Sequence, residues 1–247
     1  MDRGGVVMEE QTTRPAAEEQ GKRRFMRYVF FKAAREWRSL QEDEKSEGAA
    51  EFLSVLEKYS RTLDIRTYTL VGTRGDVDFM LWIVAEDLAP VQELVAELLA
   101  TGLGKRLDVP YSFLAMTRKS KYIGSHRHPG QEGETEEGPR RQTKYAFVYP
   151  LVKKREWYKV PFVERQRIMA EHFKIGHKYP SIKINTGYSF GLDDQEFVLA
   201  FEGDDPGEFL DLVEELRSSD ASKYTERETP IFTCAAVDHQ SMVRLLG

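Results

Sequence analysis

The 247-residue chain lacks the features that define several large protein classes. It has one cysteine, Cys234, so an internal disulfide framework and a cysteine-rich zinc or iron–sulfur site are excluded. No apolar run reaches the ~18 residues of a membrane span, and the first residues contain no run long enough for a signal peptide. Basic residues are fewer than acidic ones, since 36 Lys and Arg and 41 Asp and Glu give a net charge of −5. We therefore expect a cytoplasmic protein that has no membrane span and binds no nucleic acid.

The common enzymatic motifs are missing as well. The sequence contains no Walker A loop, no G-x-G-x-x-G after a strand, no G-x-S-x-G and no H-E-x-x-H. A Cys–His nucleophile pair would depend on Cys234, whose apolar neighbours Ile231, Phe232 and Ala235 favour a buried and inert thiol. Candidate chemistry is therefore limited to the five histidines and to the aromatic and cationic residues.

The chain divides into two halves with the same order of elements. Residues 1–23 are polar and aperiodic, which predicts a disordered or loosely docked tail. Residues 24–117 and 144–247 each show the pattern of strand, helix, strand, strand, helix and strand. A charged, Gly- and Glu-rich stretch, residues 118–143, lies between them. Its length leaves two interpretations open, a solvated linker or a lid over a site between the halves.

The two halves also resemble each other in sequence. The segment DFMLWIVAEDLAPVQELVAEL (residues 78–98) aligns without a gap with EFVLAFEGDDPGEFLDLVEEL (residues 196–216), at an offset of 118 residues. Repetition on this scale indicates a duplicated structural unit. We therefore expect an α+β fold in which two ferredoxin-like βαββαβ halves pack sheet to sheet within one chain.

One histidine lies in a position that suits metal binding. The helix expected over residues 161–179 places His172 on its apolar face, together with Ile168 and Ile175. A histidine in such a position is more often a core residue than a ligand. A single imidazole within apolar walls is, however, also the arrangement that holds haem iron. His126 and His128 form a His-x-His pair in the central stretch, which is a weak signal for metal chelation.

Aromatic and cationic residues meet at the end of the strand expected over residues 145–152. Tyr149 lies on one face of this strand, and Lys153 and Trp157 follow it. Aromatic walls with cations at the rim suit an aromatic ligand that carries several negative charges. A core tyrosine beside a basic strand end explains the same residues, and taken alone this simpler interpretation is favoured.

Taken together, these residues resemble the chlorite dismutase-like superfamily, and within it the coproheme decarboxylases. Three segments carry the resemblance: FVYPLVKKREWYKVPFVERQRIMAEHFKIGHKYP (147–180), TGYSFGLDDQEFVLAFE (186–202) and EELRSSDASKYTERETPIF (214–232). In the first segment, the Tyr-Pro pair, the Trp-Tyr pair eight residues later and the helical histidine twenty-three residues after the tyrosine keep the family's spacing. The resemblance implies a dimeric α+β barrel within one chain and a homopentameric assembly.

The resemblance also implies roles for individual residues. His172 matches the axial ligand of the haem iron, Tyr149 the tyrosine that forms a radical, and Trp157 a tryptophan close to it. The other matches are residues that would contact the propionates or the haem pocket: Lys153, Arg217, Ser222, Tyr111 and Ile184. The implied reaction is the hydrogen-peroxide-dependent oxidative decarboxylation of two propionates of coproheme (iron coproporphyrin III), which gives haem b. A transient contact with ferrochelatase is implied as well.

The distal side of the haem distinguishes the branches of the superfamily. Chlorite-decomposing members place an arginine above the iron, whereas the matching position here is expected to be Ile184, between Lys183 and Asn185. An apolar side chain cannot donate a hydrogen bond to a leaving hypochlorite, which counts against chlorite chemistry. His126 and His128 are the candidates for a distal base.

Other functions remain open from the sequence. A chlorite dismutase or a haem peroxidase would use the same haem site, and a non-enzymatic haem-binding protein would have no use for a redox-active phenol at Tyr149. A ferredoxin-like duplication can also be an RNA-binding or small-ligand module, but that class needs exposed aromatics on a basic face. The net charge of −5 argues against RNA binding.

Overall fold

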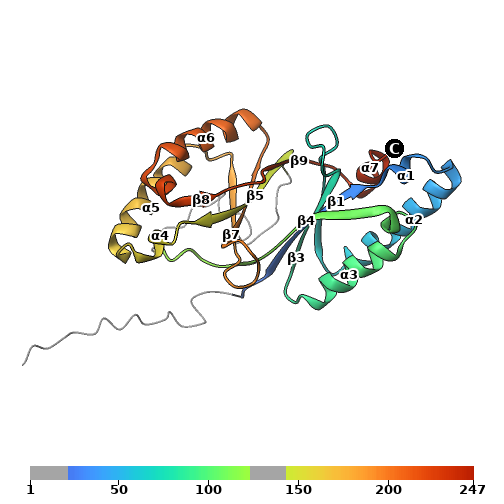
Figure 1. Cartoon of the computed structure of the whole chain (residues 1–247), viewed down its shortest axis with the longest axis horizontal. Coiled ribbons are helices and arrows are strands. Elements are labelled where there is room, and N and C mark those ends of the chain that lie inside the picture. Colours follow the sequence, from blue (N-terminus) through green and yellow to red (C-terminus); the bar gives the residue numbers. More distant parts are fainter. Residues whose placement is uncertain (1–21, 123–142) are drawn as a thin grey trace, which may run out of the picture.

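The computed structural model describes residues 22–122 and 143–247 (Figure 1). The N-terminal half comprises β1 (Phe25–Ala33), α1 (Arg35–Arg38), α2 (Glu42–Tyr59), β2 (Asp64–Thr69), β3 (Phe79–Ala85), α3 (Ala89–Ala100), the 3₁₀ helix η2 (Gly104–Arg106) and β4 (Leu107–Thr117). The C-terminal half comprises β5 (Tyr145–Lys153), α4 (Glu156–Lys159), α5 (Phe162–Gly176), β6 (Lys183–Tyr188), β7 (Phe197–Gly203), α6 (Pro206–Ser218), the 3₁₀ helix η4 (Asp220–Tyr224), β8 (Thr225–Arg227), β9 (Phe232–Ala236) and α7 (His239–Arg244).

The strands of the two halves close into one antiparallel barrel. The order is β4-β1-β3-β2 in the first half and β6-β7-β5-β9 in the second, which is the same ferredoxin-like order in both. Two seams join the halves, β4 with β6 and β2 with β9, so the sheet has no free edge along this ring. The structure confirms the predicted fold class, two ferredoxin-like halves that form a dimeric α+β barrel. It adds that the two sheets join at their edges.

Alternating side chains divide the core into the barrel interior and two outer layers. The interior contains side chains from both sheets, among them Tyr28, Trp82, Val148 and Phe232. In the N-terminal half, α2 and α3 cover the outer face of the sheet, and α5 and α6 cover the corresponding face of the C-terminal half. Figure 1 shows these two helix pairs at opposite ends of the molecule. Each half therefore has its own helix–sheet layer.

Local physical reasons set the bounds of two elements. Strand β4 begins at Leu107 and continues through Pro110 to Thr117. Pro110 lies where the β1–β4 register shifts, so a residue without an amide hydrogen is accommodated at a bulge. The helix expected over residues 161–179 ends at Gly176, and a turn leads to Pro180, which disfavours helical backbone in the residue before it.

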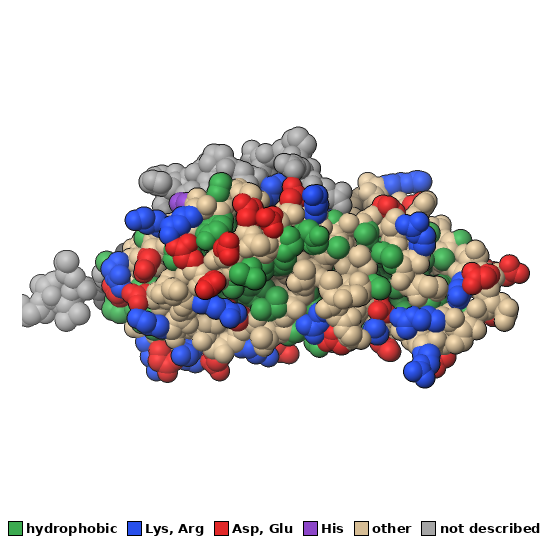
Figure 2. Space-filling view, turned by 90° about the horizontal axis from the view of Figure 1, so that it is seen from above, with side chains coloured by type: hydrophobic (Ala, Val, Ile, Leu, Met, Phe, Trp, Pro, Cys, Tyr) green, Lys and Arg blue, Asp and Glu red, His purple; other side chains and the backbone are tan. Residues whose placement is uncertain are grey.

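The surface combines exposed apolar side chains with many charges. Figure 2 shows apolar side chains across the middle of one face and charged side chains towards its two ends. No helix in residues 22–122 or 143–247 is both long enough and apolar enough to cross a bilayer.

Candidate functional site

The internal repeat allows the two helix–sheet layers to be compared position by position. In the N-terminal half, Leu81 on β3 and Leu98 on α3 are both 0% exposed. Their counterparts 118 residues later, Leu199 on β7 and Leu216 on α6, are only partly buried. A leucine at the same position in the fold is therefore fully buried in the N-terminal half and partly exposed in the C-terminal half. The side chains of the second layer therefore fill less of the space between helices and sheet.

His172 lies on the face of α5 that is directed into this layer. Ile168 and Ile175, one turn away on either side, are buried. The Nδ1 atom of His172 is buried and has no hydrogen-bond partner among the described residues. Burial, followed by the nearby positive charge of Lys153, lowers the pKa of His172 to about 4. The imidazole is therefore neutral at physiological pH, which is the form that binds a metal ion.

Tyr149 faces the same layer from the sheet side. It lies on β5, is 5% exposed, and its ring stacks on Phe201 with a centroid distance of 6.0 Å. Burial raises the pKa of Tyr149, the charge of Glu228 adds to this effect, and Arg217 opposes it. The phenol therefore keeps its proton at neutral pH, and two groups of opposite charge lie near it.

Lys153 ends β5 beside the same layer. Its Nζ atom donates hydrogen bonds to the carbonyl oxygen of Ala221 (3.1 Å) and to Oγ1 of Thr225 (3.4 Å), and lies 5.5 Å from the centre of the Trp157 ring. Burial lowers the pKa of Lys153 to about 8, although Glu228 and Glu196 act in the opposite direction. The direct hydrogen-bond partners of Nζ are neutral oxygens. An incoming carboxylate would therefore find a cation that is only partly compensated.

A buried carboxylate fixes the end of the strand that carries Lys153. Glu196 is 7% exposed and accepts hydrogen bonds from the backbone amide of Lys153 (2.8 Å) and from the hydroxyl of Tyr158 (2.6 Å). The first half contains the same arrangement, a buried carboxylate that accepts a hydrogen bond from a strand end, at the equivalent repeat position. There Asp78, 3% exposed, accepts a hydrogen bond from the backbone amide of Ala33 (2.9 Å) at the end of β1.

Trp157 lies in the short helix α4 that follows β5, and the short helix α1 is its counterpart after β1. The triplet Arg-Glu-Trp occurs at residues 35–37 and again at 155–157, and Trp37 and Trp157 are 2% and 3% exposed. The first half contains no histidine between residues 22 and 122, so it has no counterpart of His172. Trp37 is nevertheless buried there, which shows that a tryptophan at this position packs the fold even without a haem ligand opposite it. Sequence reasoning missed both this match and Glu196. The signal was available, since the two aligned segments begin at Asp78 and Glu196.

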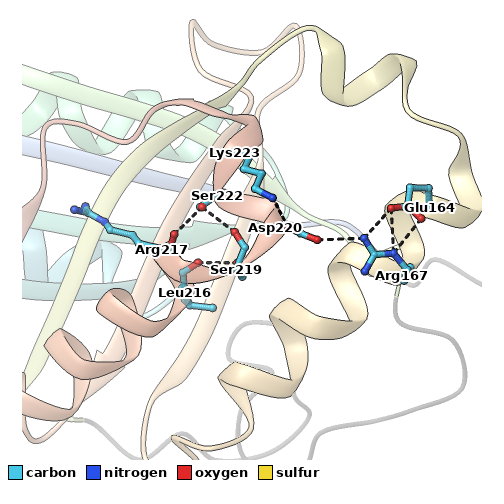
Figure 3. A network of polar contacts seen from close by, with 8 residues as sticks. All are labelled: Glu164, Arg167, Leu216, Arg217, Ser219, Asp220, Ser222 and Lys223. Atoms are coloured by element: carbon cyan, nitrogen blue, oxygen red, sulfur yellow. Dashed lines mark hydrogen bonds and ion pairs between the residues drawn. The ribbon is translucent and has the colours of Figure 1, made fainter.

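Arg217 and Ser222 lie at an open depression of about 340 Å³. Arg217 forms an ion pair with Glu228 (2.7 Å), a residue that sequence reasoning also missed. The hydroxyl of Ser222 donates towards the carbonyl oxygens of Arg217 (2.7 Å) and Ser219 (2.8 Å), as Figure 3 shows. A ligand carboxylate at this depression would compete with Glu228 for the guanidinium, and Ser222 would have to turn away from the backbone to donate to it.

Ile184 shares the layer with Tyr149 and faces α5. It lies on β6 in register with Phe201, and a Cβ atom built at Gly176 would lie 3.6 Å from the Cδ1 atom of Ile184. The side chain therefore adds an apolar surface between β6 and the end of α5. This placement is compatible with the predicted pocket position.

Tyr111 and the two central histidines are not part of this group. Tyr111 lies on β4 against the barrel interior, where its hydroxyl donates to Asp76 (2.7 Å) and its ring contacts Phe232 at a centroid distance of 5.1 Å. The predicted contact between Tyr111 and the cofactor stays a prediction. His126 and His128 lie outside the described residues.

The residues of the second layer fit an iron porphyrin. The layer is incompletely filled by its own side chains, a neutral imidazole projects from one wall, and cations lie at its edge. No three His, Cys, Asp or Glu side chains in the described part of the chain are close enough to hold a metal ion together. His172 would therefore hold the iron as a single protein ligand, and the porphyrin itself would supply the rest of the binding.

Comparison with known proteins agrees with this geometry. A family model described as chlorite dismutase matches residues 45–237. A coproheme decarboxylase of Mycolicibacterium smegmatis is 34% identical over 180 residues, which cover 72% of this chain and 75% of that protein.

Solved structures share the fold. The chlorite dismutase of Candidatus Nitrospira defluvii in complex with imidazole has a TM-score of 0.82 at 22% identity, and the match covers 90% of this chain and 94% of that chain. A mutant of that enzyme in complex with cyanide has a TM-score of 0.82 at 21% identity, with 91% and 95% covered. Together with the family match over most of the sequence, these findings establish that the chain belongs to the chlorite dismutase family.

Proposed function

We propose that this chain is a coproheme decarboxylase, which uses hydrogen peroxide to convert two propionates of coproheme into vinyl groups and so produces haem b. The observation that carries the proposal is the convergence of His172, Tyr149 and Lys153 on one incompletely filled layer. The similarity to the coproheme decarboxylase of Mycolicibacterium smegmatis supports this choice within the family.

The side chains of the layer would bind and orient the substrate. When bound, the iron porphyrin supplies the redox chemistry with peroxide. His172 would hold the iron from α5, since its neutral imidazole has a lone pair available. Lys153 and Arg217 would attract propionates at the edge of the layer, and a guanidinium can bind a carboxylate through two hydrogen bonds. Ile184 and the aromatic residues would exclude water from the reacting groups.

Tyr149 would relay the oxidation to a propionate. Its phenol would give up one electron and its proton, and would then regain a hydrogen atom from the propionate side chain. The carbon–carbon bond to the carboxyl group would then break, with hydrogen peroxide as the source of the second oxidising equivalent. In balance, one propionic acid group and one hydrogen peroxide give one vinyl group, one carbon dioxide and two waters. The reaction needs a protonated phenol at the start, which agrees with the raised pKa of Tyr149.

Mass spectrometry of the protein mixed with coproheme, before and after addition of hydrogen peroxide, tests the proposal. We expect the sequential loss of two carboxyl groups, ending at haem b. His172→Ala should change the Soret band of the bound porphyrin, and an unchanged spectrum would mean that another residue binds the iron. Stable binding of coproheme by the wild-type chain without any loss of mass would refute the decarboxylase.

A chlorite dismutase or haem peroxidase on the same site is the alternative, and chlorite is then the next substrate to try. The apolar side chain of Ile184 counts against chlorite decomposition, because that reaction needs a polar group near the leaving oxyanion. A homopentameric assembly is a further proposal from the family resemblance, and sedimentation equilibrium would test it.

A further inference from the structure

Three cations lie close together between the end of β4 and α5, two of them in contact with Tyr122 and the third with Tyr188. Arg165 on α5 donates a hydrogen bond from Nη1 to the hydroxyl of Tyr122 (3.3 Å). The Nζ atom of Lys121 lies 5.3 Å from the centre of the Tyr122 ring, and the guanidinium carbon of Arg118 lies 5.5 Å from the centre of the Tyr188 ring. Lys121 is exposed overall, but partial desolvation of its ammonium group lowers its pKa, and repulsion from Arg165 and Arg118 adds to this effect. Both arginines are therefore close enough to Lys121 for their charges to act on it.

This cationic cluster, Arg118, Lys121 and Arg165, has no carboxylate partner within residues 22–122 and 143–247. The Nε atom of Arg165 is buried and has no hydrogen-bond acceptor there. A buried guanidinium N–H without an acceptor costs free energy, and a bound carboxylate would recover it. The cluster therefore points to an anionic ligand.

The position of the cluster connects it to the layer that His172 faces. Arg165 precedes His172 by seven residues on α5, so the two side chains share one helix face and are separated by about 10 Å along the axis. Tyr122 also contacts Trp157, with a distance of 6.1 Å between ring centroids, and the Trp157 ring lies 5.5 Å from Nζ of Lys153. The cluster thus forms part of the edge of the proposed porphyrin site.

We propose that the cationic cluster is a carboxylate-binding subsite for coproheme and holds a propionate other than those beside Lys153 and Arg217. The inference rests on the proposed function. Coproheme carries four propionates around its perimeter, so Lys153 and Arg217 cannot receive all of them. Arg165 provides a planar guanidinium for paired hydrogen bonds to a carboxylate, and Lys121 and Arg118 add charge around it.

Equilibrium titration of the porphyrin-free, full-length protein tests the subsite, with the Soret absorbance as the readout. The two probes are iron coproporphyrin III and its tetramethyl ester, which has no free carboxylate. We expect Arg165→Gln to weaken binding of the acid by about 10- to 100-fold, because a charge-assisted hydrogen bond is lost. Binding of the ester should be unchanged.

Arg167→Gln is the matched control on the same helix. It removes the same charge, but the Arg167 side chain reaches Glu164 (2.8 Å) and Asp220 (3.2 Å) on the protein surface (Figure 3). Such exposed pairs contribute little to stability, so the variant should stay folded. Arg167 is not part of the cationic cluster, so we expect wild-type affinity for both probes.

A second variant covers the case in which Arg165→Gln fails to fold. Lys121 is exposed, so Lys121→Gln leaves the packing around Tyr122 intact. It should weaken binding of the acid alone by about two- to fivefold. The subsite is refuted if the wild-type protein binds coproheme and both variants match it, or if Arg165→Gln weakens acid and ester equally. If the wild-type protein itself does not bind coproheme, the proposed function fails.

Discussion

Leu98 and Leu216 occupy the same position in the two halves, so truncating each to alanine measures how full its layer is. Leu98 on α3 is 0% exposed, whereas Leu216 on α6 is partly exposed. Truncation in a sealed core costs the lost transfer free energy and adds a cavity term, whereas in an open layer the cavity term is small. In the ligand-free protein, we expect Leu98→Ala to lower the free energy of unfolding by about 3–4 kcal/mol and Leu216→Ala by about 1 kcal/mol.

Urea unfolding, followed in parallel by far-ultraviolet circular dichroism and tryptophan fluorescence, measures both costs, and coincident transitions support a two-state analysis. Saturating coproheme should stabilise the wild type and Leu98→Ala similarly. A ligand that binds only the native state raises the free energy of unfolding by an amount set by its affinity, and Leu98 lies outside the proposed site. Leu216→Ala should gain less, because the leucine would contact the ligand. Equal costs for Leu98→Ala and Leu216→Ala without ligand would mean that the second layer is as full as the first, which would refute the argument for a porphyrin site there.

Three further predictions concern the residues around this layer. Tyr149→Phe should keep the affinity for coproheme and lose turnover, measured by product mass, and a fully active variant would remove the redox role. Because the pKa of Lys153 is lowered to about 8, the free protein loses this charge above that pH, so the affinity for coproheme should fall between about pH 7 and 9. Lys153→Arg, which stays charged, should flatten that profile. Glu196→Gln should lower both stability and coproheme affinity, whereas Asp78→Asn, at the equivalent place in the first half, should lower stability alone; equal affinity losses in the two variants would contradict the positioning role of Glu196.

The duplication could be predicted from the sequence because its apolar spacing has been kept. Leu94 and Leu212 are both 0% exposed at matching helix positions, as the gapless alignment of the two segments predicts. Strand alternation placed Tyr149 on one sheet face, and helix periodicity placed His172 with its apolar neighbours. These are local patterns, and in both cases the structure shows the side chain on the face that the pattern predicts.

Long-range pairing and competing charges could not be predicted in this way. The seam between β2 and β9 pairs Thr69 with Ala235, and no local pattern specifies which edges of two similar sheets meet. Glu228 lies next to no recognisable motif, yet its pairing with Arg217 decides whether that guanidinium is available to a ligand. The sequence likewise could not show that the hydroxyl of Ser222 is directed at backbone carbonyl groups, because hydroxyl partners depend on the turn that η4 forms.

The unequal packing of the two layers should also appear in their dynamics. The helices α2 and α3 contribute four and three buried residues, whereas α6 contributes only Leu212. Elements with fewer buried apolar contacts open at lower free energy, so amides in α6 should exchange faster than those in α2 and α3 in the ligand-free protein. Coproheme should slow exchange in α5 and α6 and leave α2 and α3 unchanged, because only the second layer would gain contacts. Hydrogen exchange measured by mass spectrometry would contradict the proposed site if all four helices were protected to the same degree by coproheme.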